Sequence, residues 1–230
     1  MAILALALYG SRARGDSNEH SDIDFFAITD DRDYKMLVTG NTNVACYPTD
    51  LAIARAKDGD LFLLHICLEA KEIYSTNSEI SNLRETFQYK ESYDREISMA
   101  SDLAWFLVDS GASFRNSVLL NKRIAWCVRT ILIAKSAEAR SAVFSSRELA
   151  IFSGSARTAT LIQGKNETSF LPLLTKELAL FLQSFGKPKP KITSENDFNG
   201  YARLFEDTEN IMGLKTLQLV HADIISENYT

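Results

Sequence analysis

The sequence predicts an α+β chain: an α/β domain built on a small mixed sheet, followed by an all-helical bundle domain. Short apolar segments separated by polar turns fill the first 78 residues. From Ser78 onward, apolar residues recur at helical spacing with almost no strand signal. A chain of 230 residues with 46% hydrophobic and 24% charged content is ordinary for a globular protein. We therefore expect two domains, residues 1–78 and 79–230.

The first domain begins with a buried apolar strand that leads into a glycine, and Pro48 ends its third strand because proline cannot continue a sheet ladder. Thr49 and Asp50 favour a helix start directly afterwards. The expected elements, in chain order, are strand 2–8, a short helix from 11 to 17, strand 22–29, a polar turn over 30–41, strand 42–47, helices 49–59 and 60–70, and strand 71–75.

The second domain is expected to contain about five helices and no internal repeat. Glycines follow the apolar periodicity at 111 and 186, where they favour helix ends. The two prolines between Lys187 and Lys191 predict a stiff basic link. The expected helices are 91–109, 118–139, 147–152, 156–163, 171–185 and a last one over 197–223.

A glycine-bounded turn, Gly10-Ser11-Arg12-Ala13-Arg14-Gly15, follows the first strand. Glycine lets the backbone turn tightly and approach a ligand, and exposed backbone amides in such a turn can cradle an anion. Ser11 adds a hydroxyl, and two arginines add positive charge. This combination predicts a phosphate site.

Two carboxylates, Asp22 and Asp24, stand either side of one apolar residue in the second strand. Residues two apart on a strand point to the same face. Carboxylates held so close repel each other unless a cation lies between them, and hard oxygen ligands suit Mg²⁺ bridged to phosphates. The pair therefore predicts a metal site facing the phosphate site.

The stretch GSRARGDSNEHSDIDF, residues 10–25, resembles the minimal nucleotidyltransferases of the DNA polymerase β superfamily, whose pattern is GSxARGx5SDxD. The resemblance implies a nucleotidyltransferase domain that uses Mg²⁺ or Mn²⁺ with ATP or another nucleoside triphosphate. It implies that Asp22 and Asp24 hold the metal and act in catalysis. The residues it implies for binding the triphosphate are Gly10, Ser11, Arg14 and Ser21.

The resemblance also implies a third carboxylate on the neighbouring strand, where this chain has Asn43. An amide oxygen can ligate a divalent ion, but it brings no charge and is a poor proton acceptor. Three interpretations stay open at this point. Asn43 is a weakened catalytic ligand, Asp50 replaces it from the following helix, or the domain binds nucleotide without transferring it. Asp50 also fits the simpler role of a helix cap.

The net charge of −5 and the pI near 5.3 argue against a surface that holds long nucleic acid, because such binding depends on Lys and Arg. A small-molecule or protein acceptor fits better. Three scattered cysteines in apolar surroundings predict reduced thiols and a cytoplasmic location. The N-terminal apolar run is too short and lacks the basic start of a signal peptide, and no segment is long enough to span a membrane.

The expected function is transfer of a nucleoside monophosphate, AMP from ATP in the first instance, to a hydroxyl. The alternative is a catalytically weak or silent nucleotide-binding module, such as the antitoxin-like partner of a toxin–antitoxin pair; a nucleic-acid polymerase comes third. The helical domain shows no Arg and His five to seven residues apart, the mark of the ribonucleases that often accompany minimal nucleotidyltransferases. We expect it to bind the acceptor or to form a homodimer.

Overall fold

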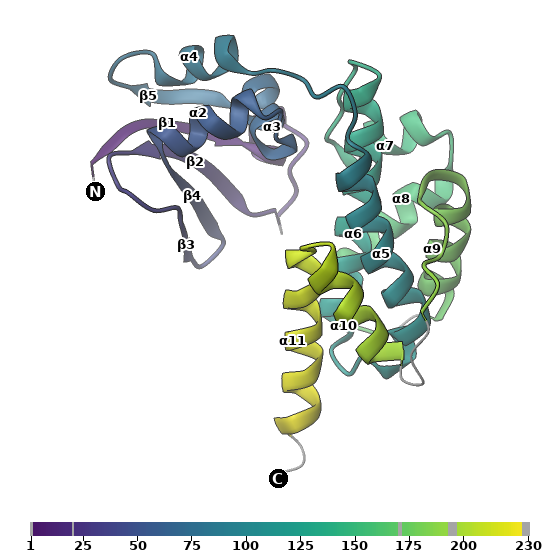
Figure 1. Ribbon diagram of the computed structural model, residues 1–230. Helices are drawn as coiled ribbons and strands as arrows, with labels where there is room; N and C mark the ends of the chain where they lie inside the picture. Colours follow the sequence, from purple (N-terminus) through teal and green to yellow (C-terminus); the bar gives the residue numbers. More distant parts are fainter. Residues whose placement is uncertain (1, 20, 170–171, 193–196, 227–230) are drawn as a thin grey trace. The chain divides into compact units, whose positions relative to one another are not determined.

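The computed structural model describes residues 2–19, 21–169, 172–192 and 197–226. The chain divides into two compact units, Met1–Glu91 and Ser92–Thr230. The first holds a mixed five-stranded sheet with helices, and the second is mostly helical (Figure 1). The fold class predicted from the sequence is confirmed.

The sheet of the first unit has the strand order β3-β4-β2-β1-β5. Its one parallel pair is β2 with β4, which starts both strands at the same edge of the sheet, and the other neighbours are antiparallel. The elements are β1 (Ile3–Tyr9), α1 (Gly10–Arg14), β2 (Ile23–Thr29), β3 (Lys35–Thr39), β4 (Thr42–Pro48), α2 (Thr49–Lys57), α3 (Leu61–Glu69), β5 (Lys71–Ser75) and α4 (Glu79–Thr86).

The core of this unit lies between the sheet and the helices α2, α3 and α4. Small residues of β1, Ala5 and Ala7, let the helices approach the sheet closely, and Phe26 fills the centre. The other members of this buried cluster are Ile28, Ala45, Tyr47, Ala52, Ala56, Leu63, Ile66, Ala70, Ile80 and Leu83. Asp60 fixes the start of α3, because its carboxylate accepts hydrogen bonds from the amides of Phe62 and Leu63.

Two expectations for this unit were wrong. The segment 30–41 is not a simple turn, because it contains the edge strand β3, every residue of which is exposed. Helix α4 had no counterpart among the expected elements, and it packs Ile80 and Leu83 into the core.

The second unit is built around the neighbouring long helices α5 (Asp94–Ser110) and α6 (Ser117–Glu138). Phe106 of α5 has ring contacts with Phe114, Phe198, Tyr201 and Phe205. The remaining helices of the described residues are α7 (Ser146–Ser153), α8 (Ala156–Gln163), α9 (Pro172–Phe185), α10 (Asp197–Asp207) and α11 (Ile211–Ser226), with 3₁₀ turns η1 (Gly111–Ser113) and η2 (Gly164–Asn166).

The expected single helix over 197–223 was wrong, because α10 and α11 are separated by a tight break. Glu209 adopts a left-handed φ of 54°, and the Asn210 side chain accepts a hydrogen bond from the amide of Gly213 at 3.0 Å. The Asn210 amide group also donates to the carbonyl of Met99 at 2.8 Å, which fastens the break to α5. A buried asparagine thus starts the second helix.

The basic link after α9 is fastened along α5. The indole of Trp105 donates to the carbonyl of Lys187 at 2.9 Å, and the amide of Lys187 donates to the Ser101 hydroxyl at 3.0 Å. Lys189 pairs with Asp109 at 2.6 Å. The link that follows α9 therefore lies along α5.

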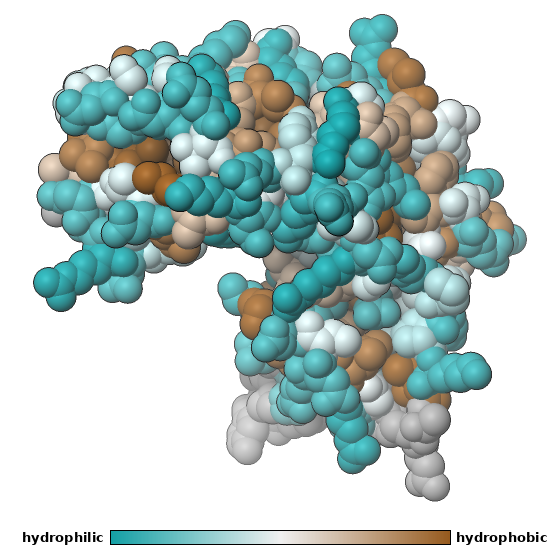
Figure 2. Space-filling model, turned by 45° about the horizontal axis from the view of Figure 1, so that its top comes forward, coloured by the Kyte–Doolittle hydropathy of each residue, from teal (hydrophilic) through white to brown (hydrophobic). Residues whose placement is uncertain are grey.

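Figure 2 shows that hydrophilic groups dominate the visible surface and that apolar groups gather in small separate patches. None of the helices in the described part of the chain has the length and apolar character needed to cross a bilayer.

Candidate active site

The glycine-bounded turn forms the short helix α1 at the end of β1. Gly10 has a φ of 75°, and Gly15 ends the helix with a φ of 84°. The amides of Gly15 and Asp16 both donate to the carbonyl of Ser11, at 2.9 and 3.0 Å. Because left-handed φ values favour glycine, the two glycines fix where this turn begins and ends.

Gly10 brings the backbone up against one of the predicted metal ligands. A Cβ atom at this position would lie 3.2 Å from Oδ2 of Asp24. The register of the sheet explains the approach, since Tyr9 at the end of β1 pairs with Asp24 at the start of β2. The absence of a side chain at Gly10 therefore leaves this face of the Asp24 carboxylate open.

Asn43 lies directly opposite Asp24 on the neighbouring parallel strand. Its Nδ2 atom donates a hydrogen bond of 3.0 Å to Oδ1 of Asp24, and both side chains are half-buried. The structure thus places an amide group against the carboxylate, and the amide both orients the carboxylate and satisfies one of its oxygens.

Asp22 precedes β2 and is exposed. Arg12 holds this segment: its Nη2 donates to the carbonyl of Ser21 at 2.9 Å and its Nε to the carbonyl of Asp22 at 3.2 Å. The Ser21 hydroxyl is engaged with Asn18, whose amide donates to it at 2.9 Å. Arg12 therefore ties α1 to the stretch of chain that carries the acids.

Arg14 points toward α3. Its Nη1 donates to Oε2 of Glu69 at 2.6 Å, and its Nε donates to Asp16 at 3.2 Å. His65 Nε2 lies 2.8 Å from the same Glu69 oxygen. Burial alone would raise the pKa of Glu69, but the hydrogen bonds and electrostatic interactions of this carboxylate with His65 and Arg14 outweigh burial and lower that pKa.

Tyr9 closes the apolar side of the site. Its ring meets the rings of Phe62 and His65 edge-on, at 5.4 and 5.5 Å between centroids. Burial, and then the negative charge of Asp24, raise the pKa of Tyr9 far above its ordinary value, so its hydroxyl stays neutral.

Asp50 does not come close to this site. It follows the far end of β4, whereas Asn43 lies near the beginning of that strand, and at about 3.3 Å per residue the strand separates them by roughly 17 Å. The structure therefore removes Asp50 as a replacement for the third ligand.

The donor set suits a divalent cation in part. Carboxylates of Asp22 and Asp24 and an amide at Asn43 are hard oxygen ligands of the kind Mg²⁺ and Mn²⁺ accept, and the face of Asp24 beside Gly10 is open to a ligand. Within the described ranges no three His, Cys, Asp or Glu side chains gather in a group that could hold a metal. A cation here would depend on substrate oxygens for the rest of its shell.

The sequence reasoning missed His65 and Glu69 as members of this region. A detectable signal existed, because the two residues stand four apart and so share one face of the helix that the sequence does predict. What the sequence could not supply was the partner, Arg14, which lies 55 residues away from Glu69 along the chain.

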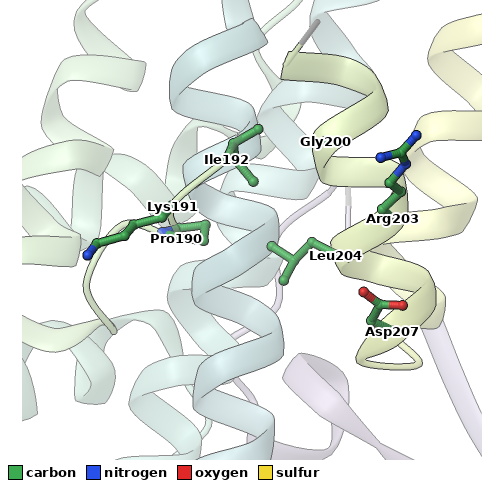
Figure 3. Close-up of a pocket in the computed structure, with 7 residues that line it drawn as sticks. All are labelled: Pro190, Lys191, Ile192, Gly200, Arg203, Leu204 and Asp207. Carbon is green, nitrogen blue, oxygen red and sulfur yellow. The ribbon is translucent and has the colours of Figure 1, made fainter. Parts of the chain in front are cut away.

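The helical unit has a pocket of about 250 Å³ between the basic link and α10 (Figure 3). Figure 3 shows Lys191 on one side and Arg203 and Asp207 of α10 on the other, with Ile192 and Leu204 between the two sides. Charged groups that do not converge give a ligand no common point of attachment.

The comparisons with known proteins concern the first unit above all. Residues 1–79 match the family model described as polymerase beta, nucleotidyltransferase. No curated protein matches the chain significantly. Among solved structures, a nucleotidyltransferase-like protein from Exiguobacterium sibiricum 255-15 aligns over 97% of this chain and 83% of its own, at 12% identity and a TM-score of 0.33.

The matched residues include the turn around Gly10, the acids Asp22 and Asp24, and Asn43. They form the edge of a mixed sheet at which the ends of three neighbouring strands, β1, β2 and β4, meet. Residues 1–79 are therefore a nucleotidyltransferase domain of the polymerase β superfamily.

Proposed function

We propose that this protein transfers a nucleoside monophosphate, AMP from ATP in the first instance, to a hydroxyl of a small-molecule or protein acceptor and releases pyrophosphate. The observation that carries the proposal is the meeting of Gly10 and Asp24. A backbone turn suited to phosphate lies against a carboxylate suited to a metal, at 3.2 Å from the missing Cβ position. The family match over residues 1–79 supports the reaction class.

Asp22 and Asp24 would hold the cation, with the amide oxygen of Asn43 as the remaining candidate ligand. Mg²⁺ or Mn²⁺, when bound, supplies charge neutralisation for the phosphate oxygens and the leaving pyrophosphate. Ser11 and the backbone around Gly10 bind the phosphates, and their fixed position orients the triphosphate for in-line attack by the acceptor hydroxyl.

The direct test is pyrophosphate release from labelled nucleoside triphosphates in the presence of Mg²⁺ or Mn²⁺ and a panel of hydroxyl acceptors. Asp24→Ala should lower the rate by about 100-fold or more, since it removes a metal ligand and not core volume. Asp50→Ala is the matched control, because it removes an exposed acid at the far end of β4. An Asp24→Ala protein that keeps the wild-type rate would refute the assignment.

A second candidate, a nucleotide-binding module with little or no transfer activity, is favoured by one observation. The position that should carry the third carboxylate carries Asn43, whose Nδ2 is bonded to Asp24. An amide in that role cannot take the proton of an attacking hydroxyl. The nucleotide would then be bound without being consumed.

Asn43→Asp distinguishes the two candidates. The substitution removes the hydrogen bond to Asp24, adds a second charge beside it and supplies a proton acceptor, so an enzyme should gain both metal affinity and rate, by about tenfold or more. A silent module should gain metal affinity alone. Asn43→Ala, which loses the same hydrogen bond without adding charge, is the control, and an Asn43→Asp protein that binds metal no better than Asn43→Ala contradicts both.

We also propose a cytoplasmic location and an acceptor other than nucleic acid. The support is the net charge of −5 and three cysteines that are free in the structure, two of them, Cys46 and Cys127, buried. A homodimer through the helical unit stays a prediction.

A further inference from the structure

Both ends of the short helix α1 contact one helix, α3. At its start, the ring of Tyr9, the residue before α1, meets the ring of His65 edge-on at 5.5 Å. At its end, Arg14 donates to Glu69 at 2.6 Å. His65 completes the link, since its Nε2 lies 2.8 Å from the Glu69 carboxylate and 3.5 Å from Nη1 of Arg14. We call Arg14, His65 and Glu69 the α1–α3 clasp.

The clasp is shielded from water. The side chains of Arg14, Glu69 and His65 are 17%, 16% and 13% exposed. Charges removed from water to this degree interact more strongly than surface pairs, and removing one partner leaves the other buried without compensation. The ion pair at 2.6 Å therefore constrains where the end of α1 can lie.

The constraint reaches the phosphate-binding residues through α1 itself. Ser11 lies one helical turn before Arg14, and its carbonyl accepts from the amides of Gly15 and Asp16. Since a single turn closed by these bonds moves as a unit, a shift of Arg14 would move Ser11 and with it the backbone at Gly10.

We propose that Arg14 is a positioning residue, which acts through Glu69 and His65 to hold the Gly10–Ser11 turn in place for the triphosphate, and that it does not contact the phosphates. The proposal rests on the proposed function for the identity of the ligand. It also gives roles to His65 and Glu69, which lie outside the GSxARGx5SDxD motif.

The alternative is that Arg14 leaves Glu69 and binds phosphate directly, and the two roles predict opposite effects of removing Glu69. A direct ligand would be released by the loss of its carboxylate partner, so ATP affinity would stay the same or rise. A positioning residue would lose its anchor, and ATP affinity would fall.

The experiment compares the full-length wild type with Arg14→Gln, Glu69→Gln and the double variant. Calorimetric titration with ATP and Mg²⁺ should show each single variant about tenfold weaker, and the double variant no weaker than either single one, because both remove the same link. Arg84→Gln is the matched control: this arginine donates to the carbonyls of Cys67 and Ala70 at the end of α3 but belongs to α4, and its loss should leave ATP affinity unchanged.

The second readout needs no nucleotide. Hydrogen exchange at the amides of Gly15 and Asp16 should be about tenfold faster in Glu69→Gln and Arg14→Gln than in wild type, and unchanged in Arg84→Gln. If Arg14→Gln does not fold, Arg14→Lys replaces it. The ATP affinity of the Arg14→Lys protein must then fall when Glu69→Gln is added to it.

Two results would overturn the proposal: ATP affinity that is unchanged or higher in Glu69→Gln while Arg14→Gln binds weakly, or exchange at Gly15 and Asp16 that neither substitution alters. A wild-type chain that binds no nucleoside triphosphate overturns the proposed function instead, and the exchange rates alone then decide whether the clasp holds α1.

Discussion

Gly10 and Gly15 share a left-handed backbone conformation but differ in what surrounds them. A Cβ at Gly10 would press on Asp24, whereas nothing lies within 4 Å of one at Gly15. The sequence alone suggested that Gly10 makes room for phosphates. The structure adds a second reason, since this glycine also makes room for the carboxylate itself.

Comparing alanine substitutions at Gly10 and Gly15 separates the effect of backbone strain from the effect of crowding Asp24. Gly10→Ala and Gly15→Ala should each cost about 1 kcal/mol of stability, because alanine resists a positive φ. Only Gly10→Ala should also weaken Mg²⁺ binding, by displacing the Asp24 carboxylate. Urea unfolding measures the first effect and a metal titration the second; equal metal affinity in the two variants would show that Asp24 tolerates the added methyl group.

At the scale of single residues, the sequence was informative where the motif and its family pattern applied. The resemblance implied that Asn43 stands on the strand beside the acids, and the register of β2 with β4 puts Asn43 opposite Asp24. The partner of Arg14 could not be found in this way. Its contact with Glu69 depends on how α3 lies against α1, and no local pattern encodes that packing.

Among the elements, most of the helices and the strands β1, β2 and β4 were predicted within a few residues, because their apolar periodicity is strong, whereas α4 was missed. Strand β3 was missed as well, since it is exposed along its whole length and alternation between a buried and a solvent face never develops. The break between α10 and α11 contains neither glycine nor proline and was missed. Its signal was Asn210, a residue type that favours helix starts.

Helix α4 begins at Glu79, whose carboxylate forms hydrogen bonds with the residues before the helix. Glu79 accepts hydrogen bonds from the hydroxyls of Ser75 and Thr76 and from the amide of Asn77. Burial is the largest single influence on this group and raises its pKa, but the hydrogen bonds together outweigh burial and lower the pKa of Glu79 to about 2. Glu79 therefore fastens the end of β5 to the start of α4.

This contact should give the protein an acid-sensitive increment of stability. Because the folded pKa of about 2 lies below the ordinary value of 4.5, the increment is complete above pH 4.5 and is lost as the pH falls toward 2. Glu79→Gln should lower the free energy of unfolding by about 1 kcal/mol at pH 7, the scale of a helix cap, and by progressively less below pH 4.5. Urea unfolding of both proteins between pH 3 and 7 checks this, and a difference that stays constant to pH 3 would contradict it.

On the scale of the whole molecule, each unit has a core of its own. Phe26 lies in the core between the sheet and its helices, and Phe106 lies at the centre of the aromatic contacts of the helical unit. Each is fully buried. Separate cores predict separate stabilities.

Phe106→Ala should destabilise the helical unit by about 3–5 kcal/mol, the usual effect of emptying a buried aromatic site. Hydrogen exchange should then accelerate in α5 and α6 while the amides of β1 and β2 keep their protection. Phe26→Ala is the reciprocal variant and should give the opposite pattern. Equal acceleration in both units by either variant would mean that the chain unfolds as one cooperative body.

The strand order of the sheet has a consequence for the chain as it is synthesised. Strand β1 lies between β2 and β5, and β5 lies more than 60 residues further along the chain. Until β5 has emerged from the ribosome, the edge of β1 that later pairs with β5 has unpaired amides and carbonyls. Other chains can pair with such an edge. The domain thus passes through a stage at which the half of its sheet that carries Asp24 can form while β1 is still open to aggregation. Slow translation between α2 and β5 would lengthen that stage.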